Sequence, residues 1–265
     1  MGLAPLWRLR AADDAAPPDV EIEANDQSPS LSRPSPLPHL SAAQPEPDSS
    51  PVAITSPAVT TSPVTAPGAE AGANAHSPLQ AAGMGWEELE AAICGCRACG
   101  LCQRRSRAVP GVGDHAARWM FVGEGPGAEE DRRGEPFVGA AGKLLDNMLA
   151  ALGLKRGEGV YIANAVKCRP PLNRTPEAAE IAACKPFLER QIALVQPRVL
   201  VALGRPAAQA LLGREISIAA ARGKRFEKDG IALIVTYHPA YLLRNPLDKS
   251  KAWEDLCFAR RQLAD

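Results

Sequence analysis

One segment sets the architecture of this chain: residues 119–127 read Trp-Met-Phe-Val-Gly-Glu-Gly-Pro-Gly. Its first four residues form a continuous apolar run, which is typical of a short buried strand. The turn that follows contains three glycines, so its backbone can closely approach a ligand such as an anion or a base. Many glycine-rich turns are plain loops, and the segment alone therefore predicts a strand and a turn but not yet a site.

Outward from this segment, apolar runs alternate between strand and helix character. Pro176 precedes the longest predicted helix and Pro197 follows it, as expected for residues that cannot continue a helix. The predicted strands are residues 119–122, 160–163, 199–203 and 231–236, and the predicted helices are residues 86–93, 140–152, 177–195, 206–212 and 253–263. This alternation predicts an α/β fold with a mainly parallel sheet and helices on both of its faces.

Polar side chains follow three of the four predicted strands. Glu124 comes after the first strand, Asn164 after the second and His238 after the last. In open parallel sheets, ligands bind beyond the carboxyl ends of the strands. We therefore expect these three residues, which are far apart in sequence, to meet at one site.

Charge and composition divide the chain into two regions. The 265 residues carry no formal net charge, but residues 1–82 contain nine acidic and three basic side chains, and residues 83–265 contain 21 acidic and 27 basic ones. The first region also holds 14 of the 25 prolines, and residues 45–67 show no apolar period. We expect a disordered Pro/Ala/Ser-rich tail at 1–82, acting as a tether rather than as a docking segment, and a folded domain at 83–265. The basic domain suits a polyanionic partner.

No segment predicts a membrane protein or a secreted one. No apolar run approaches the roughly 18 residues that a membrane-spanning helix needs. The first ten residues lack the apolar core of a secretory signal. We therefore expect the protein in the cytoplasm, where cysteines more often bind metals or stay free than form disulfides.

The cysteines predict a metal site. Four of the seven, Cys94, Cys96, Cys99 and Cys102, lie close together, and the last three form two overlapping Cys-x2-Cys pairs, Cys96/Cys99 and Cys99/Cys102. Two thiolates at this spacing can bind one metal centre, and Cys168 and Cys184 are the candidates for the remaining ligands. Spacing alone does not choose between the two pairs, nor between zinc and a [4Fe–4S] cluster.

Several motifs occur in the order in which one known family carries them. They are the Cys96-x2-Cys99 pair, the 123–127 turn, Glu130-Asp131, Gly-x-Pro-Phe-Val-Gly-x-Ala-Gly at 134–142, Tyr-Ile-x-Asn at 161–164, Lys-Cys-Arg-Pro-Pro at 167–171, Asn173-Arg174, Cys184, Leu203-Gly204, Arg-Gly-Lys at 222–224 and His-Pro-Ala-Tyr-Leu-Leu-Arg-Asn-Pro at 238–246. Over about residues 86–263 the chain thus resembles the family 4, thermostable-type uracil-DNA glycosylases, which carry a [4Fe–4S] cluster. The region before residue 83 lies outside the resemblance.

The resemblance implies both a fold and a cofactor. The fold is a three-layer α/β/α arrangement around a central, mainly parallel four-stranded sheet. The cluster ligands are Cys96, Cys99, Cys168 and Cys184, and the cluster has a structural role. The implied activity is the removal of uracil from single- and double-stranded DNA by a monofunctional, monomeric enzyme, which leaves an abasic site.

The resemblance also implies how the base is recognised. Asn164 can donate to uracil O4 and accept from N3–H, whereas cytosine has a donor in place of O4 and no N3 proton. Phe137 stacks on the extruded base, while Gly123 and the Gly125 amide approach it closely. Glu130 supports the pocket wall.

Further implied roles concern bond cleavage and DNA contact. His238 stabilises the charge that develops on uracil O2, and Glu124, with help from Asn173, organises the attacking water or stabilises the cationic sugar. Leu242 and Leu243 are candidates for an apolar wedge that fills the space of the flipped base. The predicted phosphate contacts are Arg222, Lys224 and Arg244.

Two alternatives compete with a glycosylase. A related group captures uracil-DNA covalently through a histidine in an inserted loop, but residues 169–183 contain no histidine, and Cys168 stands where that group tends to have a histidine ligand. An electron carrier would use the cluster but would leave the 123–127 turn and the residues around His238 unexplained.

Overall fold

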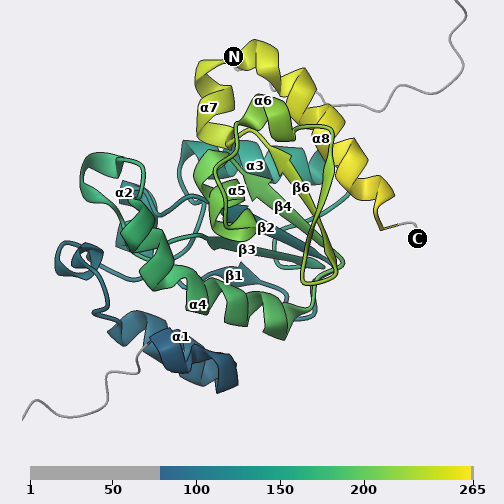
Figure 1. Cartoon of the computed structure of the whole chain (residues 1–265). Coiled ribbons are helices and arrows are strands. Elements are labelled where there is room, and N and C mark those ends of the chain that lie inside the picture. Colours follow the sequence, from purple (N-terminus) through teal and green to yellow (C-terminus); the bar gives the residue numbers. More distant parts are fainter. Residues whose placement is uncertain (1–77, 264–265) are drawn as a thin grey trace, which may run out of the picture. The chain divides into compact units, whose positions relative to one another are not determined.

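The computed structural model describes residues 78–263 (Figure 1). The predicted tail therefore lies outside the described residues, apart from its last five positions. Those positions belong to a short 3-10 helix, η1 (Pro78–Gly83), which packs on the long helix α4 (Ala178–Val195) and buries Ala81 completely. The folded unit thus includes residues that composition had assigned to the tail.

The centre of the fold is a mixed sheet with strand order β1-β3-β2-β4-β6-β5. Its strands are β1 (Val112–Gly113), β2 (Trp119–Gly123), β3 (Val160–Asn164), β4 (Val199–Leu203), β5 (Arg225–Lys228) and β6 (Ile231–Thr236). The inner four strands are parallel, as predicted, and nearly all of their residues are buried because helices cover both faces. The edge strands β1 and β5 pair antiparallel and were not predicted, since β1 has two residues and β5 is largely charged.

Helices on one face of the sheet enclose the first core. α3 (Ala140–Ala151), α7 (Pro239–Arg244) and α8 (Lys249–Arg261) cover this face. Leu145 and Leu149 of α3 and Leu256 of α8 pack there on the strand residues Phe121 and Val201. Alternation along the strands sends their other residues to the opposite face.

The opposite face is covered by α4, α5 (Arg205–Leu212) and α6 (Ile218–Ala221). Leu188 and Ile192 of α4 pack there on Met120, Val122 and Leu200. The three-layer α/β/α prediction is therefore confirmed. No helix among residues 78–263 is both long and apolar enough to span a bilayer.

A third cluster lies outside the second helical layer. α1 (Trp86–Gly95) contacts α4 in Figure 1, and Leu89 and Ile93 pack with Phe187, Cys168 and Cys184. The remaining short helices are η2 (Gly100–Gln103), α2 (Ala128–Arg133), η3 (Pro171–Asn173) and η4 (Pro246–Asp248). This layer brings the N-terminal cysteines next to the segment after β3.

The strand order creates a crevice between β2 and β4. The chain leaves β2 through α3 toward β3 on one side, whereas it leaves β4 through α5 toward β6 on the other. At such a reversal the loops diverge and leave an opening at the carboxyl ends of the two strands. Ligand binding is thus expected at residues 123–127 and 204–205.

Candidate active site

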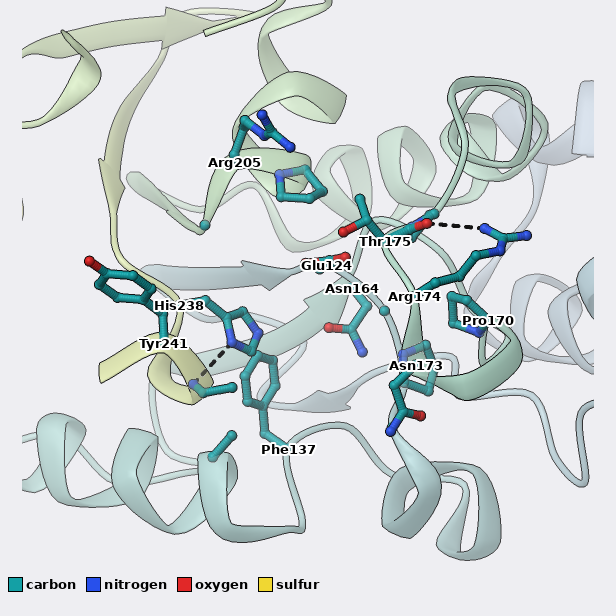
Figure 2. A pocket seen from close by; sticks show the side chains of 18 of the residues that line it. Glu124, Phe137, Asn164, Pro170, Asn173, Arg174, Thr175, Arg205, His238 and Tyr241 are labelled. Atoms are coloured by element: carbon teal, nitrogen blue, oxygen red, sulfur yellow. Dashed lines mark hydrogen bonds between the residues drawn. The ribbon is translucent and has the colours of Figure 1, made fainter. Parts of the chain in front are cut away.

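A cleft of about 800 Å³ opens at these carboxyl ends (Figure 2). The loops after β2, β3, β4 and β6 all contribute to its walls. Glu124, Asn164 and His238 line it together, so the predicted meeting of these three residues is confirmed. Figure 2 shows His238 on one side of the cleft, Asn164 at its centre and Asn173 on the opposite side.

The floor of the cleft includes Asn164 and Phe137, and Gly123, a predicted contact of the base, does not line the cleft but packs against both side chains. A Cβ atom on Gly123 would lie 2.4 Å from Asn164 Oδ1 and 2.5 Å from Phe137 Cζ, so only glycine fits there. Asn164 is 2% exposed, and its Oδ1 is buried without a hydrogen-bond partner. A buried polar atom without a partner is costly, typically by 1–3 kcal/mol. The amide is therefore poised to bind a polar ligand.

Phe137 is held in an unusual backbone conformation. Its φ is 56°, in the left-handed region that bulky residues rarely adopt. Arg156 donates from Nη1 to Pro136 O (2.9 Å) and from Nη2 to Phe137 O (2.8 Å). A Cβ atom on Gly142 would lie 1.7 Å from Phe137 O, so helix α3 can pack against this carbonyl only because residue 142 is a glycine. These contacts hold the Phe137 backbone in place, and its ring lines the cleft.

Glu130 connects two loops of the cleft wall. Its carboxylate accepts from the backbone N–H of Gly127 (3.1 Å), Val138 (2.9 Å) and Gly139 (3.1 Å). The carboxylate thus faces the backbone and joins the 123–127 turn to the Phe137 loop. This geometry agrees with the predicted supporting role.

His238 is neutral and has a defined tautomer. Its Nδ1 accepts from Ala240 N–H (3.1 Å), so in the neutral ring the proton is on Nε2. Burial lowers the pKa of His238 to about 4, with a further contribution from nearby Arg244. The ring stacks on Phe137 with a centroid distance of 5.4 Å. His238 is thus a hydrogen-bond donor at neutral pH rather than a cation.

Glu124 lies in the wall beside two residues that sequence reasoning did not identify. Burial raises the pKa of its carboxyl, while a hydrogen bond from the Thr175 side chain and the charge of Arg205 act in the opposite direction. Thr175 precedes α4 and Arg205 begins α5, and both line the cleft. No local pattern distinguishes them, because they reach Glu124 only through the tertiary fold.

Asn173 lines the cleft from the loop that follows β3. Its backbone φ is 55°, and its Oδ1 accepts from Arg169 Nε at 2.7 Å. The neighbouring Arg174 pairs with both carboxylate oxygens of Glu180, at 2.7 and 2.8 Å. This loop is therefore anchored to α4.

The structure separates the five predicted DNA-contact residues. Arg244 lines the cleft, Leu243 is 44% exposed, and Lys224 is exposed but does not line the cleft. The prediction for Leu242 was wrong: it is 1% exposed and packs in the core, because α7 turns this side chain toward the sheet.

The prediction for Arg222 was also wrong. Its guanidinium donates to Asp255 Oδ2 (2.7 Å) and to Lys251 O (2.5 Å), and it lies over the Tyr237 ring. Asp255 is buried and also accepts from the Thr236 hydroxyl (2.7 Å). Arg222 therefore neutralises a buried carboxylate on α8 and is not available for a phosphate.

The four predicted ligand cysteines line a second, smaller cavity. Cys96, Cys99, Cys168 and Cys184 share it with Cys102, and none of the seven cysteines, all of which lie among the described residues, forms a disulfide. Within residues 78–263 no group of three or more His, Cys, Asp or Glu side chains is arranged to hold a metal ion. The cavity therefore brings the predicted thiols together without itself identifying a metal.

Hydrogen-bond donors already point at three of these sulfurs. Arg105 Nη1 donates to Cys168 Sγ (2.9 Å), Lys167 N–H to Cys184 Sγ (3.3 Å) and Ala98 N–H to Cys96 Sγ (3.5 Å). Burial raises the pKa of Cys184 to about 12 in the protein alone. The donors and the nearby cations suit sulfurs that carry negative charge.

Lys167 lies between the cysteine cavity and the cleft. Its side chain is completely buried, and its Nζ donates to Asn164 O (2.9 Å) and to Gln191 Oε1 (2.5 Å). Burial lowers the pKa of Lys167 to about 8, whereas Cys184 and Cys168 act to raise it. Lys167 thus contacts both regions: its side chain donates to the backbone of Asn164, and its backbone N–H donates to the Cys184 sulfur.

Comparison with known proteins gives a consistent assignment. Residues 110–257 match the family model of the uracil DNA glycosylase superfamily. The chain is 50% identical over 152 residues to a type-4 uracil-DNA glycosylase of Thermotoga maritima (57% of this chain, 79% of that protein). It is 46% identical over 169 residues to a type-4 uracil-DNA glycosylase of Sulfurisphaera tokodaii (60% and 76%), and 44% identical over 181 residues to one of Pyrobaculum aerophilum (65% and 92%).

The chain belongs to the type-4 uracil-DNA glycosylases. The resemblance inferred from the motifs is thereby confirmed. The superfamily match includes the four cleft loops together with Cys168 and Cys184, but it begins after Cys96 and Cys99.

Proposed function

We propose that this protein removes uracil from DNA by hydrolysing the N-glycosidic bond, which releases the free base and leaves an abasic site. Such an activity begins the excision repair of deaminated cytosine in the DNA of the cytoplasm, and we propose that the protein acts on it as a monomer. The observation that carries the proposal is the meeting of Glu124, Asn164 and His238 in one cleft, with the buried Asn164 amide oxygen unpaired.

Recognition of uracil is assigned to Asn164 and Phe137. The base must leave the helical stack before it can enter the cleft. The unpaired Asn164 Oδ1 accepts from uracil N3–H, and its Nδ2 donates to O4. Cytosine would leave both Asn164 groups mispaired, at a cost of about 1–3 kcal/mol for each buried group. Phe137 stacks on the ring, and the Gly125 backbone lies in the same wall.

Departure of the base is assigned to His238. As the glycosidic bond breaks, uracil leaves as an anion with charge on O2. The neutral imidazole donates its Nε2 proton in a hydrogen bond to this oxygen, while Nδ1 stays bound to the Ala240 amide. A fixed donor of this kind lowers the barrier because it needs no reorientation during the reaction.

Attack on the sugar is assigned to Glu124, with assistance from Asn173. An ionised Glu124 stabilises the cation-like sugar and orients a water molecule toward its anomeric carbon. Thr175 and Arg205 hold this carboxylate. Asn173, on the far side of the cleft in Figure 2, is assigned to the water or to the sugar phosphate.

Contacts with DNA outside the cleft are assigned to Leu243, Arg244 and Lys224. Leu243 is the remaining candidate for the wedge that occupies the space of the extruded base, because Leu242 is buried. Arg244 lies at the cleft and Lys224 on the exposed surface, where each can contact a phosphate.

We further propose that Cys96, Cys99, Cys168 and Cys184 hold a [4Fe–4S] cluster. The proposal is supported by their shared cavity, by the donors that point at their sulfurs, and by the family to which the chain belongs. Arg105 and the buried Lys167 supply positive charge beside a cluster whose four thiolates give it net negative charge. When bound, the cluster ties the segment after α1 to the segment after β3 and takes no part in bond cleavage.

A direct test uses an oligonucleotide with a single uracil, both alone and in a duplex. The purified protein is incubated with it, free uracil is measured, and the DNA is then treated with alkali. We expect free uracil and strand scission at the uracil position, and neither with matched cytosine or thymine controls. A covalent protein–DNA product without free uracil would instead support the trapping alternative, and the absence of both products would overturn the proposal.

A further inference from the structure

Leu172 is an exposed apolar side chain with no packing role in the described structure. It is 96% exposed, the largest fraction among the exposed large hydrophobic residues of the described region, ahead of Leu247 at 91% and Leu243 at 44%. Single exposed leucines are common and alone indicate nothing. Leu172, however, also has φ of 54°, in the left-handed region, which costs a non-glycine residue roughly 1–2 kcal/mol.

The loop that carries Leu172 is held rigidly. Asn173 N–H donates to Pro170 O (3.1 Å) and Arg174 N–H to Pro171 O (3.1 Å). The prolines restrict the backbone before Leu172, and the ion pair of Arg174 with Glu180 anchors the loop after it. Contacts on both sides of Leu172 therefore support its unfavourable backbone conformation.

The position of this loop relates it to the cleft. Pro170, Asn173 and Arg174 form the side of the cleft opposite His238 and Tyr241 in Figure 2. Leu243 projects from α7, the helix that begins directly after His238. Two exposed leucines thus belong to segments on opposite sides of the same opening. Arg169 donates to Asn173, the residue after Leu172, and Arg244 follows Leu243, so each of the two segments also carries a cation that can contact a phosphate.

We propose that Leu172 is a second DNA wedge, which enters the base stack of duplex DNA from the side of the cleft opposite Leu243. Extrusion of a nucleotide opens an apolar gap between neighbouring bases, and a leucine from each side of the opening fills more of this gap than one alone. Contact with the bases buries the surface that Leu172 exposes in the free protein. This inference rests on the proposed glycosylase function and concerns duplex substrates only, since a single strand has no paired stack to hold open.

The test compares single-stranded and duplex activity of Leu172→Ala. We expect kcat/KM for uracil in a duplex opposite adenine to fall about tenfold, which corresponds to about 1.4 kcal/mol. With the same uracil strand unpaired, we expect a change within about twofold. Leu247→Ala is the matched control, because Leu247 is almost as exposed but lies in η4, none of whose residues lines the cleft, whereas Leu172 lies between the lining residues Pro170 and Asn173. It should remain within about twofold on both substrates.

A second measurement uses a pyrene nucleotide opposite the uracil. The large pyrene ring occupies the gap itself. If Leu172 acts as a wedge, the loss of kcat/KM in Leu172→Ala should therefore be smaller with pyrene than with adenine opposite the uracil. Equal losses of kcat/KM on single strands and duplexes, or no loss on the duplex, would overturn the proposal that Leu172 is a wedge. If the wild-type protein releases no uracil from the single strand, the proposed function fails instead, so the two failures are distinguishable.

Discussion

The cleft and the cysteine cavity both take residues from the end of β3 and the segment after it, but they differ in how these residues are bonded. Asn164 at the end of β3 faces the cleft with an unpaired oxygen, whereas four residues later Cys168 faces the cysteine cavity with a donor already on its sulfur. The cleft is open, and its buried Asn164 Oδ1 lacks a hydrogen-bond partner. The cysteine cavity is small, apolar and internally bonded. The comparison indicates that the cleft is organised for a transient ligand and the cysteine cavity for a permanent one.

Lys167 is the direct connection between these two regions. Its backbone amide contacts Cys184, and its side chain contacts the backbone of Asn164. Changes in the cysteine cavity should therefore affect stability first and activity as a consequence. Changes in the cleft should affect activity alone. The following predictions test this division, in order of decreasing expected effect.

The largest effect is expected for Cys184→Ser. Loss of one ligand should remove most of the iron and lower the thermal midpoint by about 10 °C or more, as expected for a loss of several kcal/mol in a domain of this size. Cys257→Ser on α8 is the matched control and should keep its iron. Iron analysis, visible absorption and thermal unfolding provide the measurements. A Cys184→Ser protein with full iron content would remove Cys184 from the ligand set.

Next in size is His238→Ala. Removal of the donor to the departing oxygen should lower kcat by about 10²–10³-fold. Binding of uracil-DNA and iron content should change little, because the imidazole lines the cleft, and the thermal midpoint should fall only by the loss of the cap that His238 provides to α7. Single-turnover kinetics and equilibrium binding separate these quantities. Equal losses in binding and in rate would contradict a role limited to the transition state.

An intermediate effect is expected for Asn164→Asp. A carboxylate cannot donate to uracil O4, so the ratio of kcat/KM for uracil over cytosine should fall about tenfold or more, from one buried group left mispaired. Asn147→Asp, on the exposed face of α3, is the control. The assay is release of each base from otherwise identical oligonucleotides. Unchanged discrimination would mean that another group reads the base.

Lys167→Met tests the connection between the regions. The variant leaves Asn164 O and Gln191 Oε1 without their donor, which should destabilise the fold by about 1–3 kcal/mol. We expect both faster iron loss on dilution and a higher KM for uracil-DNA. Lys185→Met, in an exposed ion pair on α4, should change neither. A variant that loses iron but keeps its KM would show that the two regions are independent.

The smallest effect concerns the pH dependence of the wild-type rate. Because burial raises the pKa of Glu124 above 4.5, its ionised form is lost at a higher pH than usual as the solution is acidified. His238, with a pKa of about 4, stays neutral over that range. The rate should therefore fall at acidic pH as Glu124 becomes protonated. In Glu124→Gln, this acidic part of the pH–rate profile should become flat. An acidic fall in rate that persists unchanged in Glu124→Gln, or that has its midpoint at an ordinary histidine pKa, would argue against this assignment.

Much of the fold followed from local patterns. The four parallel strands and the long helices came from apolar runs and periodicity, because burial on one or both faces leaves a direct trace in the order of residues. The edge strands β1 and β5 left no such trace, since one has two residues and the other is charged and half exposed. The convergence of Glu124, Asn164 and His238 followed from their place after parallel strands, which is a rule of topology.

The sequence by itself thus determined the class of fold, the order along the chain of its four inner strands and longer helices, and the residue types that stand at the carboxyl ends of these strands. Only the tertiary structure decided which side chains are available. It buried Leu242 and exposed Leu243, and it bound Arg222 to Asp255. It also brought Thr175 and Arg205 to Glu124. Finally, it placed Lys167 between the cleft and the cysteine cavity. The physical reason is that periodicity records whether a residue is buried, whereas the direction and partners of a side chain depend on elements that are distant in the chain.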